Sequence, residues 1–273
     1  MRVAFQGELG AYSEAAVLEH FGADTTPIPC EAFDDVFAAV TTGSSDYGMV
    51  PIENSLAGSI HRNYDLLLKN NLSVVGEHYL YVNHTLIGLP GARLEDIRRV
   101  ISHPQALAQC EGYLHSLSGV KIESVYDTAG SVKMVKQMGD QTVAAIASRR
   151  AADLYGMQAL ADRIQDNPEN LTRFLIISPQ PGEPGEDAKT SIVFSLKNAP
   201  GALFKAMSVF ALRDIDLTKI ESRPLTQKPF EYFFYIDFAG SILEPVAAKA
   251  LAHLEEYALF LRVFGSYPRH RYT

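Results

Sequence analysis

The sequence predicts an α/β domain of two lobes, followed by a smaller α+β domain. Three observations support this prediction. Buried-strand and helix patterns alternate over roughly the first 160 residues, a segment rich in proline and glycine follows at 178–187, and the order of elements then changes to βαββαβ. A chain of 273 residues is long enough for two domains that each have a substantial core.

The composition is that of an ordinary globular protein, with 47% hydrophobic and 21% charged residues. The formal net charge is −8, and no cluster of lysine or arginine stands out. A nucleic-acid partner is therefore not expected. A small anionic substrate remains compatible with this charge, because a local cationic site can override the overall balance.

The two cysteines, Cys30 and Cys110, are far apart in apolar surroundings and form neither a disulfide framework nor a zinc motif. This indicates a reducing compartment. The chain reaches Gly7 after five residues that follow Met1, which leaves no room for the apolar segment of a signal peptide. No apolar run approaches the roughly 20 residues of a membrane span. We expect a cytoplasmic protein that does not bind membranes.

The first lobe begins with a buried strand at Val3–Phe5 and a glycine loop, after which Ser13 is placed to cap a helix from Glu14 to about His20. A strand, a glycine loop and a helix N-terminus together favour anion binding, although a plain capped turn would look the same. Further elements are expected in the order strand 25–29, helix 33–41, strand 46–50 and helix 59–69.

Polar residues gather where the strands of the first lobe end. Glu53, Asn54 and Ser55 follow the strand at 46–50, and open α/β sheets bind ligands at such carboxyl ends. A simple helix cap is the alternative.

The second lobe is expected to begin with a long β-type stretch, 72–87, that crosses between the lobes. The strand at 98–102 leads into His103 and Gln105, which flank a helix beginning at Pro104. A strand at 120–126, a helix from Asp127 or Thr128 to about 138, a strand at 143–147 and a helix at 148–155 complete the alternation. This pattern predicts parallel sheets covered by helices, and two such blocks predict the cleft seen in periplasmic binding proteins.

The segment Asn167–Phe174 is predicted to be a loop that leads into a buried strand, and this strand extends to Ser178. It would present the amide of Asn170, the hydroxyl of Thr172 and the guanidinium of Arg173 together, unless it is only a surface turn.

The C-terminal domain follows a linker in which ten residues, 178–187, include three prolines and two glycines. Its elements are expected at 189–197, 200–212, 215–221, 230–238, 245–257 and 259–265. The order βαββαβ is that of the ferredoxin-like plan.

Five motifs in this order resemble those of the prephenate dehydratases with a C-terminal ACT domain, the regulatory domain that binds phenylalanine. They are Gly7-x-x-Gly10-x-Tyr12-Ser13, Pro51-Ile-Glu-Asn-Ser55, His103-Pro-Gln-Ala-Leu107, Thr172-Arg-Phe174, and the ACT pair Asn198-Ala-Pro-Gly-Ala-Leu203 with Glu221-Ser-Arg-Pro224.

The resemblance implies a catalytic domain at 1–178, with lobes at 1–78 plus 159–178 and at 79–158. A linker at 179–188 and an ACT domain at 189–267 would follow. The implied reaction is the decarboxylating dehydration of prephenate to phenylpyruvate in L-phenylalanine biosynthesis, or of arogenate to L-phenylalanine. It also implies feedback inhibition by L-phenylalanine and a homo-oligomer, expected to be a tetramer built from dimers.

The same resemblance supplies the expected site. Thr172 would donate to the leaving hydroxyl and Arg173 would bind a substrate carboxylate, while Glu53 or His103 could be the general acid instead of Thr172. Substrate contacts are expected from Ser13, Asn54, Ser55, Gln105, Asn170 and Phe174. Phenylalanine contacts are expected from Asn198, Ala199, Gly201, Ala202, Leu203, Glu221 and Ser222.

No metal or organic cofactor is expected, because the eight histidines show no paired ligand spacing and no phosphate loop is present. A competing hypothesis is a solute-binding module with an amino-acid sensor, and the missing export signal argues against it. A transcriptional effector-binding domain would need a helix-turn-helix or a basic patch, which the sequence lacks.

Overall fold

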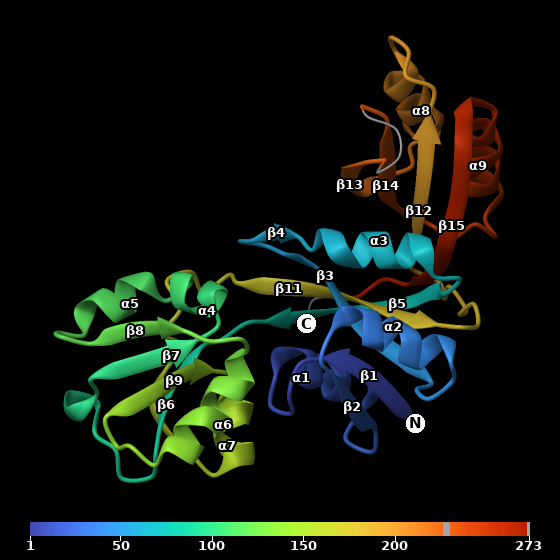
Figure 1. Cartoon of the computed structure of the whole chain (residues 1–273). Helices are drawn as coiled ribbons and strands as arrows, with labels where there is room; N and C mark the ends of the chain where they lie inside the picture. The colour runs from blue at the N-terminus through green and yellow to red at the C-terminus, as the bar shows by residue number, and fades with distance from the viewer. Residues whose placement is uncertain (226–229, 272–273) are drawn as a thin grey trace. The chain divides into compact units, whose positions relative to one another are not determined.

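The computed structural model describes residues 1–225 and 230–271, and within these ranges no helix combines the length and the apolar character needed to cross a membrane. The described chain forms two compact units (Figure 1). The first comprises residues 1–60 and 79–174, and the second comprises residues 61–78 and 175–273. These divisions do not coincide with the boundary predicted near residue 178, so the catalytic and regulatory domain limits stay a prediction.

One sheet has the strand order β2-β1-β3-β11-β5, with the short β4 paired to β3. Its central strands β1 and β3 are almost wholly buried apolar residues, as expected for strands covered on both faces. Helices α1 and α2 pack against β1 and β3 through Val17, Phe37 and their neighbours. The elements of this part are β1 (Arg2–Gln6), α1 (Tyr12–Phe21), β2 (Thr26–Cys30), α2 (Phe33–Thr41), β3 (Tyr47–Asn54), β4 (Gly58–Ser59), α3 (His61–Lys69), β5 (Ser73–Tyr81) and β11 (Leu171–Ser178).

A second sheet, in the order β10-β6-β9-β7-β8, carries the other α/β lobe of the first unit. Leu86, Val100 and Ile146 of this sheet meet Leu107 and Leu114 of the helices above it in one apolar core. Figure 1 shows α4 and α5 on one face of the sheet and α6 and α7 on the other. The elements are β6 (Thr85–Gly88), η1 (Leu94–Asp96), β7 (Arg99–Ser102), α4 (Pro104–Ala108), α5 (Glu111–Ser116), β8 (Lys121–Ser124), α6 (Thr128–Met138), β9 (Val143–Ala147), α7 (Arg149–Tyr155) and β10 (Gln158–Asp162).

The prediction of purely parallel sheets is wrong for this lobe. Strands β7, β8 and β9 are parallel, but β6 runs antiparallel to both β9 and β10. The preceding strand, β5, belongs to the other sheet, so β6 enters this sheet outside the βαβ alternation from which parallel strands were predicted. The expected continuous strand at 72–87 is also interrupted between Tyr81 and Thr85, and β10 was not predicted.

Two local predictions near the motifs need correction. Helix α1 begins at Tyr12 with Ala11 as its N-cap, so Ser13 lies in the first turn and does not cap the helix. Strand β3 continues through Asn54, so Pro51–Asn54 belong to the strand and not to a loop after it. The pairing of β3 with β1 ends at Met49, so Pro51 lies beyond that ladder and owes it no hydrogen bond.

The C-terminal part of the second unit forms an antiparallel four-stranded sheet in the order β13-β14-β12-β15. Phe194 and Phe238 of the sheet pack on Phe210 and Leu254 of the two helices. The predicted order βαββαβ is confirmed by β12 (Ala188–Leu196), α8 (Ala202–Ala211), β13 (Leu217–Pro224), β14 (Tyr232–Ala239), α9 (Pro245–Tyr257) and β15 (Ala258–Pro268).

Within the second unit, helix α3 and the first part of β5 contact this βαββαβ domain. Arg262 of β15 donates to four backbone carbonyls at and after the end of α3, at 2.8 to 3.3 Å. Lys189 of β12 and Glu77 of β5 form an ion pair in which both side chains are buried. These contacts explain why residues 61–78 group with the C-terminal half of the chain.

Candidate active site

A cavity of about 150 Å³ in the first unit collects polar groups from several predicted motifs. It lies where the ends of β3 and β7 and the start of β11 meet the first turns of α1, α4 and α6. It is lined by Tyr12, Ser13, Pro51, Asn54, Ile60, Val82, His84, His103, Gln105, Ala106, Gln109, Thr128, Thr172 and Phe174.

The cavity is suited to an anion although no lysine or arginine is among these lining residues. Tyr12 and Ser13 begin α1, and Thr128 begins α6, so two helices of ten and eleven residues start at the cavity wall. The N-terminus of a helix carries partial positive charge and backbone N–H groups. Helix termini can therefore attract a negative substrate here.

Asn54 lies at the centre of a network of hydrogen bonds in the site. Its Nδ2 donates to Asn170 Oδ1 at 2.8 Å and to Thr172 Oγ1 at 3.0 Å, and its Oδ1 accepts from the backbone amides of Leu56 and Ala57. All three side chains are buried or nearly so, with exposed fractions of 8% or less. The structure thus joins the Pro51–Ser55 motif to the Asn167–Phe174 segment through their side chains.

Gln109 and His84, for which no role was predicted, extend this network. Gln109 Oε1 accepts from Asn170 Nδ2 at 3.0 Å and lies 2.8 Å from His84 Nε2. The other ring nitrogen of His84 lies 2.8 Å from the hydroxyl of Tyr12. Gln109 is the last polar residue of the stretch that begins at His103. That position was the only signal in the sequence that could have found it.

His103 and Gln105 line the cavity from the start of α4. His103 Nδ1 accepts a hydrogen bond from the Gln105 backbone amide at 3.2 Å, so the histidine caps the helix that it was predicted to flank. The imidazole is therefore oriented by the backbone, and the Gln105 side chain remains exposed at the cavity. Whether His103 transfers a proton to substrate stays a prediction.

Three predicted residues, Glu53, Ser55 and Arg173, are not among those that line the cavity. Arg173 alternates with Thr172 and Phe174 along β11, so its side chain points to the other face of the sheet, where its guanidinium lies 6.0 Å from the Tyr79 ring centre. Ser55 accepts from the Leu171 amide at 3.0 Å and donates to the Glu169 carbonyl, which fixes the approach to β11. The predicted substrate contacts of all three residues stay predictions.

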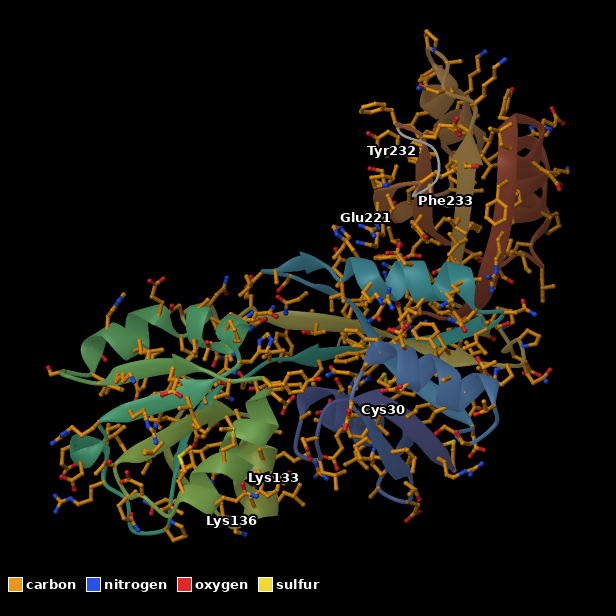
Figure 2. The ribbon with its side chains drawn as sticks, in the orientation of Figure 1. Cys30, Lys133, Lys136, Glu221, Tyr232 and Phe233 are labelled. Atoms are coloured by element: carbon orange, nitrogen blue, oxygen red, sulfur yellow. The ribbon has the colours of Figure 1, made fainter. Side chains whose placement is uncertain are left out.

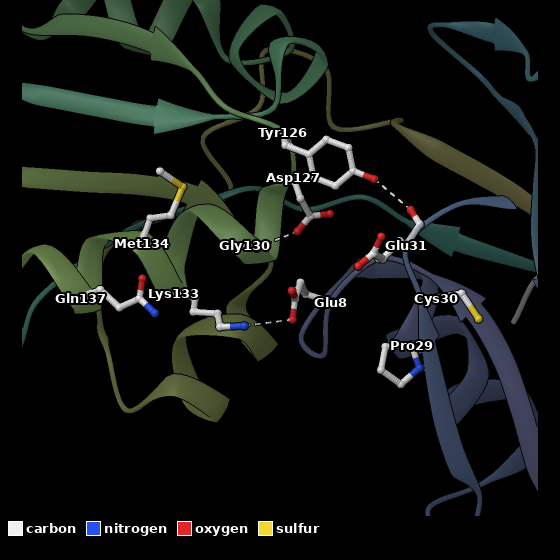
Figure 3. A pocket seen from close by; sticks show the side chains of 11 residues that line it. Glu8, Pro29, Cys30, Glu31, Tyr126, Asp127, Gly130, Lys133, Met134 and Gln137 are labelled. Carbon is white, nitrogen blue, oxygen red and sulfur yellow. Dashed lines mark hydrogen bonds and ion pairs between the residues drawn. The ribbon is translucent and has the colours of Figure 1, made fainter. Parts of the chain in front are cut away.

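A second cavity of the first unit is larger, about 380 Å³, but its charge is unsuited to an anion (Figure 3). Glu8, Glu31 and Asp127 contribute three carboxyl groups to its wall, against one ammonium from Lys133. Burial raises the pKa of Asp127, with a further contribution from Glu8. Lys133 lies 3.5 Å from Glu8, and the hydroxyl of Tyr126 donates to the Glu31 carbonyl at 2.8 Å.

In the βαββαβ domain, a cavity of about 120 Å³ contains four of the residues predicted to bind phenylalanine. Gly201 stands beside them as the N-cap of α8, with a φ of +76° that favours glycine. Glu221 and Ser222 do not line this cavity, whereas Tyr232 does; Figure 2 labels Glu221 and Tyr232. Glu221 instead lies 3.3 Å from His61. The lining residues are Leu196, Lys197, Asn198, Ala199, Ala202, Leu203, Phe230, Glu231, Tyr232 and Phe234.

Among residues 1–225 and 230–271, no group of three or more histidine, cysteine, aspartate or glutamate side chains is arranged to hold a metal ion. The polar side chains that line the first cavity carry hydroxyl, amide and imidazole groups.

Comparison with known proteins identifies one family. Residues 3–182 match the family model described as prephenate dehydratase. The chain is 52% identical, over 98% of its length and 73% of the relative's, to "Arogenate dehydratase/prephenate dehydratase 2, chloroplastic" from Arabidopsis thaliana.

Two solved structures have the same fold over almost the whole chain. One is a prephenate dehydratase from Arthrobacter aurescens in complex with L-Phe, with a TM-score of 0.91 and 33% identity over 98% of this chain and 90% of that one. The other is described as "GqqA, a novel type of quorum quenching acylases", with a TM-score of 0.92 and 36% identity over 99% of this chain and 98% of that one.

Proposed function

The chain belongs to the prephenate dehydratase family, and from this premise we propose that it converts prephenate to phenylpyruvate in L-phenylalanine biosynthesis. The substrate loses its ring carboxylate as carbon dioxide, and the electron pair of that C–C bond enters the ring. The C–O bond at the opposite carbon breaks at the same time, and the departing oxygen takes up a proton to leave as water. Formation of the aromatic ring favours the reaction.

The observation that carries this proposal is the pairing of Asn54 with Thr172 at the cavity wall. The reaction develops negative charge on a leaving oxygen, so a donor positioned there lowers the barrier. Asn54 donates to Thr172 Oγ1 and occupies one of its lone pairs, which leaves the hydroxyl hydrogen of Thr172 to be presented to the substrate. A threonine hydroxyl is a weak acid, and hydrogen bonding to the leaving oxygen is the role that its chemistry supports.

Anion binding by neutral groups fits the same substrate. Prephenate carries two carboxylates, and the cavity offers the first turns of α1 and α6 together with hydroxyl and amide side chains. A site without a fixed cation also holds the ring carboxylate loosely, which favours its departure as uncharged carbon dioxide. Phe174 supplies an apolar surface for the ring.

Arogenate is the alternative substrate, and the Arabidopsis relative is named for both activities. The two substrates differ only in a keto or an amino group on the side chain. Measuring kcat/KM of the purified enzyme on prephenate and on arogenate tests the proposal. Turnover of neither substrate contradicts the proposed function, whereas a higher value for arogenate shifts the main substrate within it.

For the similarity to the structure described as an acylase, the relevant question at Thr172 is whether its hydroxyl is paired with a base. Hydrolysis of an acyl group calls for a nucleophile in contact with a base. Thr172, the buried hydroxyl at the centre of the site, accepts a hydrogen bond from the amide of Asn54, which is not a base. The geometry therefore favours the dehydratase.

We also assign the βαββαβ domain as an ACT domain that binds L-phenylalanine and inhibits the enzyme. The Arthrobacter relative was solved with L-Phe bound. The cavity at the start of α8 combines Leu203 and Phe234, which suit a phenyl ring, with loop backbone at Asn198 and Ala199, which suits the charged ends of an amino acid.

Helix α3 provides a route from this domain toward the catalytic motifs. Arg223 of β13 donates to Asp65 of α3 at 2.7 Å, and Glu221 lies 3.3 Å from His61 at the start of the same helix. The rings of Tyr64 and Tyr235 lie 4.8 Å apart between these two contacts. Along the chain, α3 follows Asn54 through the short strand β4. A ligand that displaces β13 therefore acts on the segment that carries Asn54.

We also propose that the enzyme is a homotetramer built from dimers and that it is cytoplasmic. We expect no nucleic-acid or membrane partner. A phenylalanine site shared between two subunits would couple the ligand to subunit arrangement, and coupling of about 1–3 kcal/mol is typical for such regulation.

A further inference from the structure

A chain of side-chain hydrogen bonds connects Tyr12 to Thr172, and one fixed point determines the direction of each bond. The backbone amides of Leu56 and Ala57 lie 3.1 and 2.9 Å from one side-chain atom of Asn54. A backbone amide can only donate, so this atom is the oxygen Oδ1. The amide nitrogen of Asn54 therefore faces Asn170 and Thr172.

The orientation of the next two amides follows. Asn54 Nδ2 carries only donor hydrogens, so Asn170 must present its oxygen at the 2.8 Å contact. The amide nitrogen of Asn170 then faces Gln109, which must in turn present its oxygen at 3.0 Å. The same Gln109 oxygen lies 2.8 Å from Nε2 of His84, so that ring nitrogen has to carry a hydrogen.

The second ring nitrogen of His84 is then an acceptor. Burial lowers the pKa of His84, which keeps the ring neutral with a single N–H. The hydroxyl oxygen of Tyr12 lies 2.8 Å from Nδ1 and 2.9 Å from the backbone carbonyl of Asn83. The hydroxyl has one hydrogen, which it can donate to the Asn83 carbonyl or to Nδ1, and donation to Nδ1 gives the acceptor nitrogen of the neutral ring its donor.

We propose that His84 is a positioning residue whose neutral Nε2–H tautomer, with Nδ1 accepting from the Tyr12 hydroxyl, supplies the donor that completes the hydrogen-bond chain anchored at Asn54 and so keeps Thr172 oriented. It acts through Gln109, Asn170 and Asn54 and does not donate to the reacting atoms. This role rests on the proposed function, because it concerns the hydroxyl hydrogen that Thr172 presents to the leaving oxygen.

The opposite tautomer would disturb every later bond. With hydrogen on Nδ1, Nε2 would become an acceptor and the Gln109 amide would have to turn its nitrogen toward the ring. The NH₂ group of Asn170 would then face the NH₂ group of Gln109. Turning the Asn170 amide would instead place its nitrogen next to the amide nitrogen of Asn54, so that two donors would face each other. The Asn54 amide cannot turn, because its oxygen is held by two backbone amides.

Three variants separate this role from packing. In Tyr12→Phe the ring that packs edge-on against His84 remains, and only the hydroxyl is lost. In His84→Gln the new amide nitrogen falls near the position of Nε2 and can still donate to Gln109, whereas in His84→Asn it falls near Nδ1. We expect kcat of Tyr12→Phe and His84→Asn to fall by at least about tenfold with KM nearly unchanged, and His84→Gln to retain most of kcat.

The tautomer itself is measured by ¹⁵N NMR of the histidine rings in the full-length parent, with the His84 signals identified by their loss in His84→Gln. The expected spectrum is that of a neutral ring with hydrogen on Nε2. A ring with hydrogen on Nδ1, or an imidazolium, in a parent that turns over substrate overturns the role of His84 alone. Equal kcat in Tyr12→Phe and parent also overturns it. A parent that turns over neither prephenate nor arogenate overturns the proposed function and this role with it.

Discussion

Asn54 Nδ2 lies 3.0 Å from Thr172 Oγ1, although the two residues are 118 positions apart in the sequence. The contact unites the end of β3 with the start of β11 and makes two separate motifs into one site. Its consequence is chemical, because an amide that donates to the threonine oxygen directs the hydroxyl hydrogen away from itself and toward the cavity.

A first prediction concerns Glu14, which accepts a hydrogen bond from the Gly10 amide in the glycine loop before α1. Burial alone would raise the pKa of Glu14, but hydrogen bonds from Arg150 and from the Gly10 amide, together with the Arg150 charge, lower it overall. Because the folded-state pKa lies below the unfolded value, this stabilisation is present above about pH 4.5 and is lost as the pH falls through the folded-state pKa. Glu14→Gln should therefore be destabilised at pH 7, by roughly 1–3 kcal/mol.

Urea unfolding of parent and Glu14→Gln at pH 7 and at pH 3.5 measures this difference. We expect the difference in unfolding free energy to narrow at the lower pH. A difference that stays constant or grows in acid would show that the carboxylate charge of Glu14 does not stabilise the fold.

A second prediction concerns the buried pair of Glu77 and Lys189, whose charged atoms lie 2.8 Å apart. Glu77→Gln removes the carboxylate charge that lies 2.8 Å from the buried Lys189 ammonium, so the free energy of unfolding should fall by about 3–5 kcal/mol. The exposed pair of Glu8 and Lys133 is the matched control, and Glu8→Gln should cost about 1 kcal/mol or less. Equal losses in the two variants would contradict the structural role of the buried pair.

A third prediction tests the route through α3. Asp65→Asn weakens the 2.7 Å contact with Arg223, and we expect the phenylalanine concentration for half-inhibition to rise several-fold while kcat without phenylalanine is unchanged. Asp46→Asn, which weakens an exposed pair with Arg2 in the other unit, serves as the control. Inhibition curves that coincide for parent and Asp65→Asn would remove this contact from the regulatory route.

A fourth prediction places phenylalanine at the start of α8. Gly201 has a φ of +76°, so a valine there would strain the backbone at the N-cap of α8, directly before Ala202 of the cavity wall. Gly201→Val should abolish binding of phenylalanine in calorimetry and spare basal turnover. Gly119→Val is the control, because Gly119 has a similar φ of +73° and equally open surroundings away from this cavity. Binding retained in Gly201→Val would place the phenylalanine site elsewhere.

Much of the fold could be read from the sequence because apolar runs and turn residues mark most elements. The helices at Phe33–Thr41 and Pro245–Tyr257 have their predicted bounds, and the C-terminal βαββαβ order is the predicted one. The antiparallel direction of β6 could not be predicted from the sequence, because the direction of a strand in a sheet depends on pairing between segments that are distant along the chain. The continuation of β3 through Pro51 was missed for a related reason, since proline usually ends a strand.

The site was predictable where short motifs carry it and not where tertiary contacts create it. Asn54, Gln105 and Thr172 stood in recognisable motifs. His84 gave no such signal, because its role depends on Tyr12 and Gln109, which come from other elements. The faces to which the side chains point were also not predicted. In β11 the side chains alternate, so Thr172 and Phe174 line the cavity and Arg173 does not.

The central claim is that the hydroxyl of Thr172 assists loss of water from prephenate or arogenate, and the most direct test removes only that hydroxyl. In Thr172→Val the side chain keeps its size and branching. We expect an unchanged unfolding temperature within a few degrees and a kcat lower by on the order of 10²–10³, measured as phenylpyruvate absorbance from prephenate or phenylalanine from arogenate. Thr172→Ser should recover part of the rate. A Thr172→Val enzyme that folds normally and turns over substrate at the parent rate would contradict the account.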